Sequence, residues 1–239
     1  NPRMSSSPPR GKQFGLMLVA VIALLILPLI AQQFGNAWVR IVDTALLYVL
    51  LALGLNIVVG YAGLLDLGYV AFYAVGAYMF ALLASPHLTE TFPAIAAMFP
   101  NGLHMPIWVV LPLGAALAGL AGVLLGSPTL KLRGDYLAIV TLGFGEIIRV
   151  FLNNLDHPVN ITNGPKGIGP IDSMHFFGFD LGARHELFGL EIPPVTNYYY
   201  LFLALVIISV VICYRLERSR IGRAWMAIRE DEIAAKAMG

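Results

Sequence analysis

The sequence predicts an all-α fold, a polytopic bundle of transmembrane helices, and three observations support this prediction. Hydrophobic residues make up 58% of the 239 residues, and only 12% are charged, whereas a soluble domain is roughly a quarter charged. The mean hydropathy is +0.77. The apolar residues also gather in runs close to the ~20 residues that a helix needs to cross a hydrocarbon core of about 30 Å.

Six apolar segments meet or nearly meet this length, and we expect about six spans. They lie at about 16–31, 41–59, 64–84, 107–125, 136–152 and 198–214. A basic tail before an apolar run is also typical of a secretory signal, but no small-x-small cleavage site follows the first segment. We therefore interpret that segment as a retained span.

The basic residues predict the orientation, because Lys and Arg favour cytoplasmic flanks. With the N-terminus inside, eleven basic residues flank the inner side and only Arg40, Lys166 and Arg184 flank the outer side. The inner residues are Arg3, Arg10, Lys12, Lys131, Arg133, Arg215, Arg218, Arg220, Arg223, Arg229 and Lys236. We expect a cytoplasmic tail over 1–15, a transmembrane domain over 16–214 and a cytoplasmic segment over 215–239, so that both residue 239 and the N-terminus lie inside.

Two longer connections fall on the outer side. The loop over about 85–106 contains no Lys or Arg and several prolines, which predicts irregular structure or a short surface helix. The loop over about 154–197 is rich in Gly and Pro around Gly164–Pro170, which predicts an ordered, turn-rich platform. Two roles are open for this platform, a docking surface for an external partner or a cap over the bundle.

The densest glycine pattern lies between Gly54 and Gly76, in GLNIVVGYAGLLDLGYVAFYAVG. Such glycines permit either close helix packing or a broken helix whose free backbone groups line a cavity. A break near Gly60–Gly63 would aim a helix N-terminus, with unpaired N–H groups, at the bundle centre. Candidate residues of a translocation path here are Gly60, Gly63, Asp66, Gly68 and Tyr69.

Charged residues near the membrane need a partner or water, because a carboxylate at mid-membrane costs about 2.5 to 3.5 kcal/mol on insertion scales. For Asp66, a bond to a substrate ammonium, a bond to a neighbouring helix and a wet position at the inner interface all remain open. Glu146 and Arg149 stand three residues apart on one helix face, which predicts an ion pair between them rather than a substrate contact. We keep both as candidate path residues. Asp135 suits a helix N-terminus.

After the last span, RLERSRIGRAWMAIREDEIAAKAMG has apolar residues at three- and four-residue steps, which predicts a short amphipathic helix. Its first half is basic and its second half is mixed in charge. Two locations are open for this helix: the membrane surface or a groove in a partner protein. The candidate partner-coupling residues are Arg220, Gly222, Arg223, Trp225, Ile228, Glu230, Glu232, Ala234, Ala235 and Gly239.

Motifs of catalysis or metal binding are missing from the sequence. The single cysteine, Cys213, allows no disulfide framework and no cysteine-built metal site. There is no HExxH or GxSxG motif, and the five histidines fall in predicted outer loops. No GxxxxGK[ST] phosphate loop is present, so nucleotide hydrolysis would come from another polypeptide. We therefore expect a non-catalytic chain that binds no cofactor itself.

Four stretches resemble the LivM-type permease subunits of branched-chain amino acid ABC importers. They are GLNIVVGYAGLLDLGYVAFYAVGAY, LRGDYLAIVTLGFGEIIRVFLNN, TNGPKGI and RSRIGRAWMAIREDEIAAKAMG, in the expected order over about Leu46–Gly239. The resemblance implies an ABC importer permease fold in a bacterial inner membrane. It also implies four kinds of partner: the lipid bilayer, a second permease subunit, cytoplasmic ATPase subunits that bind ATP and Mg, and a periplasmic amino-acid-binding protein, with no nucleic acid.

The resemblance also assigns 215–239 as the coupling segment. Ala234, Ala235 and Gly239 fit the AA-xxx-G part of the importer coupling motif, although Ile233 stands where that motif usually has Glu. Asp66 is a second departure, since family members often carry an uncharged residue there. The family continues beyond the position of Gly239, which implies that the sequence is C-terminally truncated.

These features give a leading hypothesis and one alternative. The leading hypothesis is a permease subunit of an ATP-driven importer for branched-chain amino acids, rocked between two states by a separate ATPase. The alternative is an ion- or proton-coupled secondary transporter of amino acids, with Asp66 or Glu146 as a relay. ATP dependence of uptake separates the two.

Overall fold

The computed structural model describes residues 10–132 and 134–238, and the described chain is mostly helical. Arg3, Arg133 and Gly239, which the sequence assigns to the inner side, lie outside these residues. The α-helices are α1 (Arg10–Gln33), α2 (Asn36–Leu55), α3 (Val70–Leu83), α4 (His87–Thr91), α5 (Pro93–Met98), α6 (Ile107–Thr129), α7 (Asp135–Asn154), α8 (Pro194–Glu217), α9 (Arg220–Glu230) and α10 (Glu232–Ala237). A π-helical turn, η1 (Asn56–Tyr61), continues α2, and a 3₁₀ turn, η2 (Gly164–Lys166), follows α7.

Four segments of the described chain are long and apolar enough to cross a membrane. They are Gln13–Gln33, Asn36–Tyr61, Ile107–Thr129 and Pro194–Glu217. The predicted span over 64–84 is found as α3, an apolar helix of only 14 residues, which is about 21 Å long at 1.5 Å per residue. The predicted span over 136–152 is found within α7, which has 20 residues. Membrane crossing by α3 and α7 stays a prediction.

The chain forms two compact units, which we describe separately. The first comprises the described part of Asn1–Val49 together with Gly182–Ile207, and the second comprises Leu50–Leu181 and the described part of Ile208–Gly239. The first unit is centred on the fully buried Val39 and Tyr199 and on Leu203. It therefore joins α1 and the start of α2 to the start of α8.

A proline in α1 explains how α8 is attached to it. Pro28 lies inside α1 and has no N–H, so the carbonyl of Leu24, four residues earlier, lacks its helical donor. The Tyr199 hydroxyl, on α8, donates a hydrogen bond of 2.6 Å to that Leu24 carbonyl. The Tyr200 hydroxyl donates one of 2.9 Å to the Leu25 carbonyl. The two tyrosines therefore satisfy carbonyl groups at the proline.

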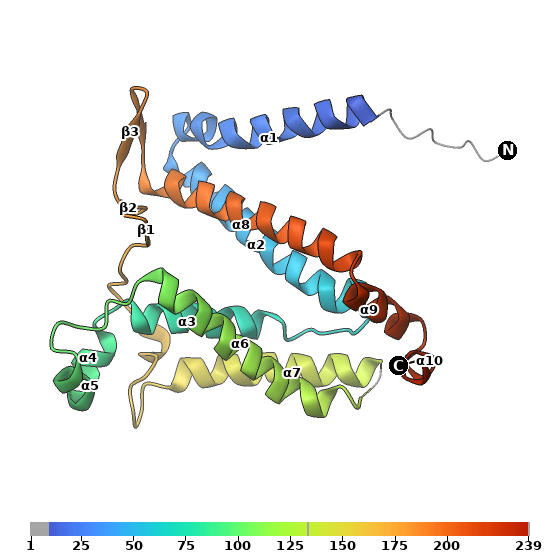
Figure 1. Cartoon of the computed structure of the whole chain (residues 1–239). Coiled ribbons are helices and arrows are strands. Elements are labelled where there is room, and N and C mark those ends of the chain that lie inside the picture. The colour runs from blue at the N-terminus through green and yellow to red at the C-terminus, as the bar shows by residue number, and fades with distance from the viewer. Residues whose placement is uncertain (1–9, 133, 239) are drawn as a thin grey trace. The chain divides into compact units, whose positions relative to one another are not determined.

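The second unit is built around three helices, α3, α6 and α7, which lie side by side (Figure 1). Small residues of α6 face α3: a Cβ placed on Gly122 would lie 3.8 Å from the Phe72 ring, and one on Gly114 would lie 4.0 Å from Met79. These two glycines of α6 thus contribute to the packing against α3. A Cβ placed on Gly119 would have no neighbour within 4 Å.

The all-α prediction omits two short β-hairpins in the loop over 154–197. In one, β1 (His175–Phe176) pairs with β2 (Phe179–Asp180), and in the other, β3 (His185–Leu187) pairs with β4 (Leu190–Ile192). Phe177–Gly178 and Phe188–Gly189 form the turns, and all four residues have positive φ, as type I′ turns require. Phenylalanine is uncommon in that conformation, so the usual turn signal is missing from the sequence. The loop over 85–106 contains the short helices α4 and α5.

The attachment of α8 to α1 predicts non-additive stability changes. We expect Tyr199→Phe to lower the free energy of unfolding by about 1–2 kcal/mol, because the Leu24 carbonyl has no helical donor and loses the hydroxyl that bonds to it. In a Pro28→Ala background the new backbone N–H at position 28 can bond to the Leu24 carbonyl, so the same substitution should cost less. Unfolding in detergent micelles of the single and double variants measures this coupling. Tyr48→Phe, at a side chain that is 66% exposed, should change little, and an equal cost of Tyr199→Phe in both backgrounds would contradict the assignment.

Candidate functional site

The candidate site is a helix break over Ala62–Tyr69, which separates η1 from α3 in the second unit. The helical hydrogen bonds end with Ala62 N–H to Ile57 O, 3.3 Å, and Leu64 N–H to Val58 O, 3.1 Å. Gly63 has φ +69°, a conformation that favours glycine. The break thus occurs beside the glycines for which the sequence left a broken helix and close packing both open.

The helix break is bound to α7 at close range. The Leu67 N–H donates a hydrogen bond of 3.0 Å to the Thr141 hydroxyl. A Cβ on Gly68 would collide with the Thr141 carbonyl oxygen, and a Cβ on Gly145 would lie 3.2 Å from the Gly68 Cα. Gly68 is therefore required so that the two backbones can pack together. At this position the structure supports close packing as the reason for the glycine. Thr141 was not singled out from the sequence, because a lone threonine in an apolar helix carries no distinguishing pattern.

Asp66 has a local partner within the helix break. Its Oδ1 accepts a hydrogen bond of 2.8 Å from the Gly68 N–H, as a turn-forming aspartate commonly does. The amides of Leu67 and Gly68, just before α3, are thus already bonded. These two N–H groups, which a helix break would leave free before α3, are therefore bonded within the protein and not available to a ligand. The Tyr69 hydroxyl lies where a Cβ on Gly54 would project, so Tyr69 fills the space beside α2.

The segment after α8 forms two short helices, and the side chain of the residue that precedes each helix caps its start. The Ser219 hydroxyl accepts a hydrogen bond of 3.1 Å from the Gly222 N–H at the start of α9. Asp231 Oδ1 accepts bonds from the Ile233 and Ala234 N–H groups, 2.8 and 3.2 Å, at the start of α10. The predicted single amphipathic helix is thus divided at Asp231, because the side chain of that aspartate caps a new helix.

Gly222 sets the tight connection between α8 and α9. A Cβ at this position would collide with the Leu216 carbonyl oxygen and lie 2.8 Å from that of Glu217. Only a residue without a Cβ lets α9 begin so close to the end of α8. Among the other predicted coupling residues, Arg220 and Arg223 are exposed on α9, and the Arg223 guanidinium donates to the Arg218 carbonyl at 3.0 Å.

An open cavity of about 1250 Å³ brings the helix break and the two short helices together within the second unit. One wall is Ala62–Leu65, and a second is the connection before α7, including Leu130 and Asp135. Most of the predicted coupling residues line the third wall: Trp225, Ile228, Glu230, Glu232, Ala234 and Ala235. Of the predicted path residues, Gly63 lines the cavity.

One direct contact joins α9 to the helix break. The Arg229 guanidinium Nη1 donates a hydrogen bond of 2.7 Å to the Gly60 carbonyl oxygen. A Cβ on Gly63 would lie 2.7 Å from Arg229 Cγ. Sequence reasoning omitted Arg229 from both candidate sets, because its partners are backbone atoms of a distant segment and leave no side-chain pattern. Its place in the basic last turn of an amphipathic helix was the available signal.

The predicted ion pair on α7 is confirmed. Arg149 Nη2 lies 2.8 Å from Glu146 Oε2, and the two side chains are 66% and 57% exposed. Arg149 Nε also donates to the same oxygen at 2.9 Å. These two candidate path residues pair with one another and do not line the cavity beside the helix break.

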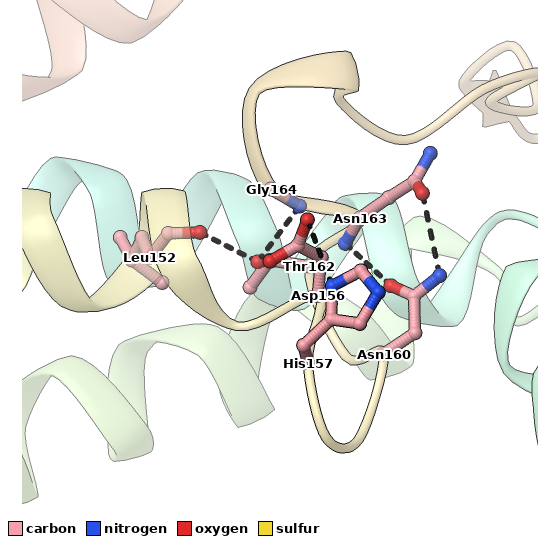
Figure 2. A network of polar contacts seen from close by, with 7 residues as sticks. All are labelled: Leu152, Asp156, His157, Asn160, Thr162, Asn163 and Gly164. Atoms are coloured by element: carbon pink, nitrogen blue, oxygen red, sulfur yellow. Dashed lines mark hydrogen bonds and ion pairs between the residues drawn. The ribbon is translucent and has the colours of Figure 1, made fainter.

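The loop that follows α7 is ordered by side-chain hydrogen bonds (Figure 2). The Thr162 side chain is almost fully buried, and its hydroxyl donates to the Leu152 carbonyl at 2.5 Å. Asn160 Oδ1 accepts a bond of 2.8 Å from the Asn163 N–H, and Asn163 adopts φ +59°. The turn-rich platform predicted from this stretch is therefore present. Within residues 10–132 and 134–238 no group of three His, Cys, Asp or Glu side chains is placed to hold a metal ion.

Comparison with known proteins assigns the family. Residues 37–239 match the model of the branched-chain amino acid transport system permease component. The chain is 42% identical, over 92% of its length, to the high-affinity branched-chain amino acid transport system permease protein LivM of Escherichia coli (strain K12). It is 40% identical, over its whole length, to the protein of the same name from Salmonella typhimurium.

A probable branched-chain amino acid transport permease protein LivM from Methanocaldococcus jannaschii is 29% identical over 81% of the chain. The chain spans 50% and 53% of the two bacterial relatives and 56% of the archaeal one. No solved structure matches it. The extent of the family match and the identity to these relatives show that the chain belongs to the branched-chain amino acid transport permease family.

Proposed function

We propose that this chain forms part of the membrane-spanning permease subunit of an ATP-driven importer for branched-chain amino acids. The observation that carries the proposal is the family match over residues 37–239, together with relatives named as branched-chain amino acid transport permeases. In this proposal the chain supplies part of the translocation path and no catalytic group. Hydrolysis of ATP, with Mg, takes place on separate cytoplasmic ATPase subunits.

The proposed arrangement places about six spans in a bacterial inner membrane, including α3 and α7, with both described ends cytoplasmic. The segment over 215–239 then faces the ATPase, and the loop over 154–197 faces a periplasmic amino-acid-binding protein. A second permease subunit completes the path. The excess of basic residues on the proposed inner side supports this orientation.

The contacts in the second unit support a division of labour for this function. The helix break contains Gly63 and Gly68 and follows η1, which includes Gly60. The proposed coupling helices α9 and α10 line the same cavity as the break. A break with backbone groups at membrane depth is tolerated where it lines a cavity or is buried in protein. We infer that movement of α9 and α10 on ATP binding changes the shape of the path at this break.

The secondary-transporter alternative has less support. Asp66, its candidate relay, is engaged with the Gly68 amide in a local turn. Glu146, the other candidate relay, pairs with Arg149. Co-purification of the ATPase with the tagged, assembled permease, and uptake that depends on ATP in the absence of an ion gradient, test the importer proposal directly.

The Gly222 contacts predict that Gly222→Ala disrupts coupling. The added methyl meets the Leu216 and Glu217 carbonyl oxygens, so α9 must shift, at a cost of about 1–3 kcal/mol. We expect ATP-driven uptake of radiolabelled leucine by reconstituted vesicles to fall by about tenfold, which corresponds to ~1.4 kcal/mol. The matched control is Gly143→Ala, at a helical glycine with open space around it, and this variant should retain uptake. Equal uptake by both variants would remove Gly222 from the coupling machinery.

The local bond of Asp66 predicts that Asp66→Asn retains transport. The amide side chain keeps an oxygen that can accept from the Gly68 N–H, so the turn persists without a titratable proton. We expect uptake within about twofold of the unmodified protein, which is less than ~0.5 kcal/mol, and unchanged dependence on ATP. Loss of uptake in Asp66→Asn, with uptake by the unmodified protein driven by a proton gradient without ATP, would favour the relay alternative instead.

A further inference from the structure

We propose that Arg229 is a positioning residue that links the coupling helix α9 to the helix break and transmits its movement into the membrane domain. This inference rests on the proposed function, since it assumes that α9 moves with an ATPase. It goes beyond that function by naming the side chain and the backbone atoms through which the movement passes.

The Gly60 carbonyl needs a donor because its helix ends one residue later. The last carbonyl groups of a helix have no partner in a following turn, and η1 ends at Tyr61. The Ile57 and Val58 carbonyls are satisfied by the Ala62 and Leu64 amides. Arg229 supplies a donor to Gly60 at 2.7 Å from α9, which is 169 positions away in the sequence. A cationic donor is favourable at this end of a helix, where the backbone dipole is negative.

The stem of Arg229 contacts the other side of the same turn. A Cβ on Gly63 would lie 2.7 Å from Arg229 Cγ and 3.3 Å from its Cβ. The absence of a side chain on Gly63, at φ +69°, thus lets the stem lie against the backbone. Arg229 holds the turn at two points, by a charge-assisted hydrogen bond at Gly60 and by contact at Gly63.

The helix break that follows this turn is also bound to α7. The Leu67 N–H bonds to the Thr141 hydroxyl, and Gly68 packs on the Thr141 backbone. A shift of α9 that carries Arg229 with it therefore acts on the end of η1 and, through the helix break, on α7. Such a chain of packed and hydrogen-bonded groups is a physical route for coupling, which only a coupling measurement can establish.

Neighbouring basic side chains have contacts within the cytoplasmic segment or at its start. Arg223 donates to the Arg218 carbonyl, and Lys236 pairs with Glu232 at 2.6 Å. The Arg218 guanidinium carbon lies 4.1 Å from the centre of the Tyr214 ring. Arg229 differs from these three because its guanidinium bonds to the backbone at the end of η1.

The test compares Arg229→Met, Arg229→Lys and Gly63→Ala in the assembled transporter. Methionine keeps an unbranched apolar stem but removes the donors, and lysine keeps the charge and a donor. Alanine at position 63 leaves the guanidinium but pushes the stem away and strains the turn at φ +69°. The control is Arg40→Met, which makes the same change at an exposed arginine of α2, outside the coupling segment. Three quantities are measured: ATPase recovered by co-purification, ATP hydrolysis, and uptake of radiolabelled leucine from the binding protein.

We expect the ATPase to co-purify with Arg229→Met and Gly63→Ala as it does with the unmodified protein, and these assemblies should still hydrolyse ATP. Their uptake of leucine should fall by about tenfold, the equivalent of ~1.4 kcal/mol in coupling. Arg229→Lys should restore part of the uptake, and Arg40→Met should leave all three quantities within about twofold.

Two results would overturn the inference while leaving the proposed function in place. One is unchanged uptake in both Arg229→Met and Gly63→Ala. The other is loss of ATPase recovery in Arg229→Met, which would make Arg229 a docking residue for the partner instead of a link to the helix break. Failure of the unmodified protein to recover an ATPase would overturn the proposed function, and this inference with it.

Discussion

The interruption of the helix between Tyr61 and Val70 is the feature on which the site depends. A break inside a membrane domain leaves backbone groups without helical partners, and unsatisfied groups cost several kcal/mol in hydrocarbon. The protein supplies a specific partner to several of them. Asp66 accepts from Gly68, Thr141 accepts from Leu67 and Arg229 donates to Gly60. These bonds come from the break itself, from α7 and from α9, so the requirement for backbone partners also fixes which helices meet there.

The same requirement shapes the first unit at a different kind of interruption. Pro28 removes one helical donor from α1, and the hydroxyl of Tyr199 replaces it at the Leu24 carbonyl. Aromatic side chains with a polar end suit this role, because the ring is buried while the hydroxyl reaches a backbone group. In both units, a local defect in one helix therefore becomes a specific attachment point for another.

The charged residues of the second unit are matched in ways that separate structural roles from a translocation path. Glu146 and Arg149 pair along α7, and Asp66 closes a local turn. Neither arrangement requires a substrate to satisfy the charge. The cavity beside the helix break instead offers glycine backbone and apolar side chains on one side and the helices α9 and α10 on the other.

The sequence alone determined the membrane class, the Glu146–Arg149 pair and the amphipathic segment after α8, because composition and helical spacing are local properties. At Gly60–Gly63 its glycine density allowed either a broken helix or close packing, and the structure decided for the break. Its resemblance to the permease family agreed with the family match over residues 37–239. Only the tertiary structure decided that Arg229 and Thr141 hold the break, that Tyr199 serves Pro28, and that Phe-Gly turns form two hairpins. Those contacts join segments that are distant in the sequence or use backbone atoms as partners. Every residue has a backbone carbonyl, so the sequence does not mark which carbonyl groups will accept a bond from a distant side chain.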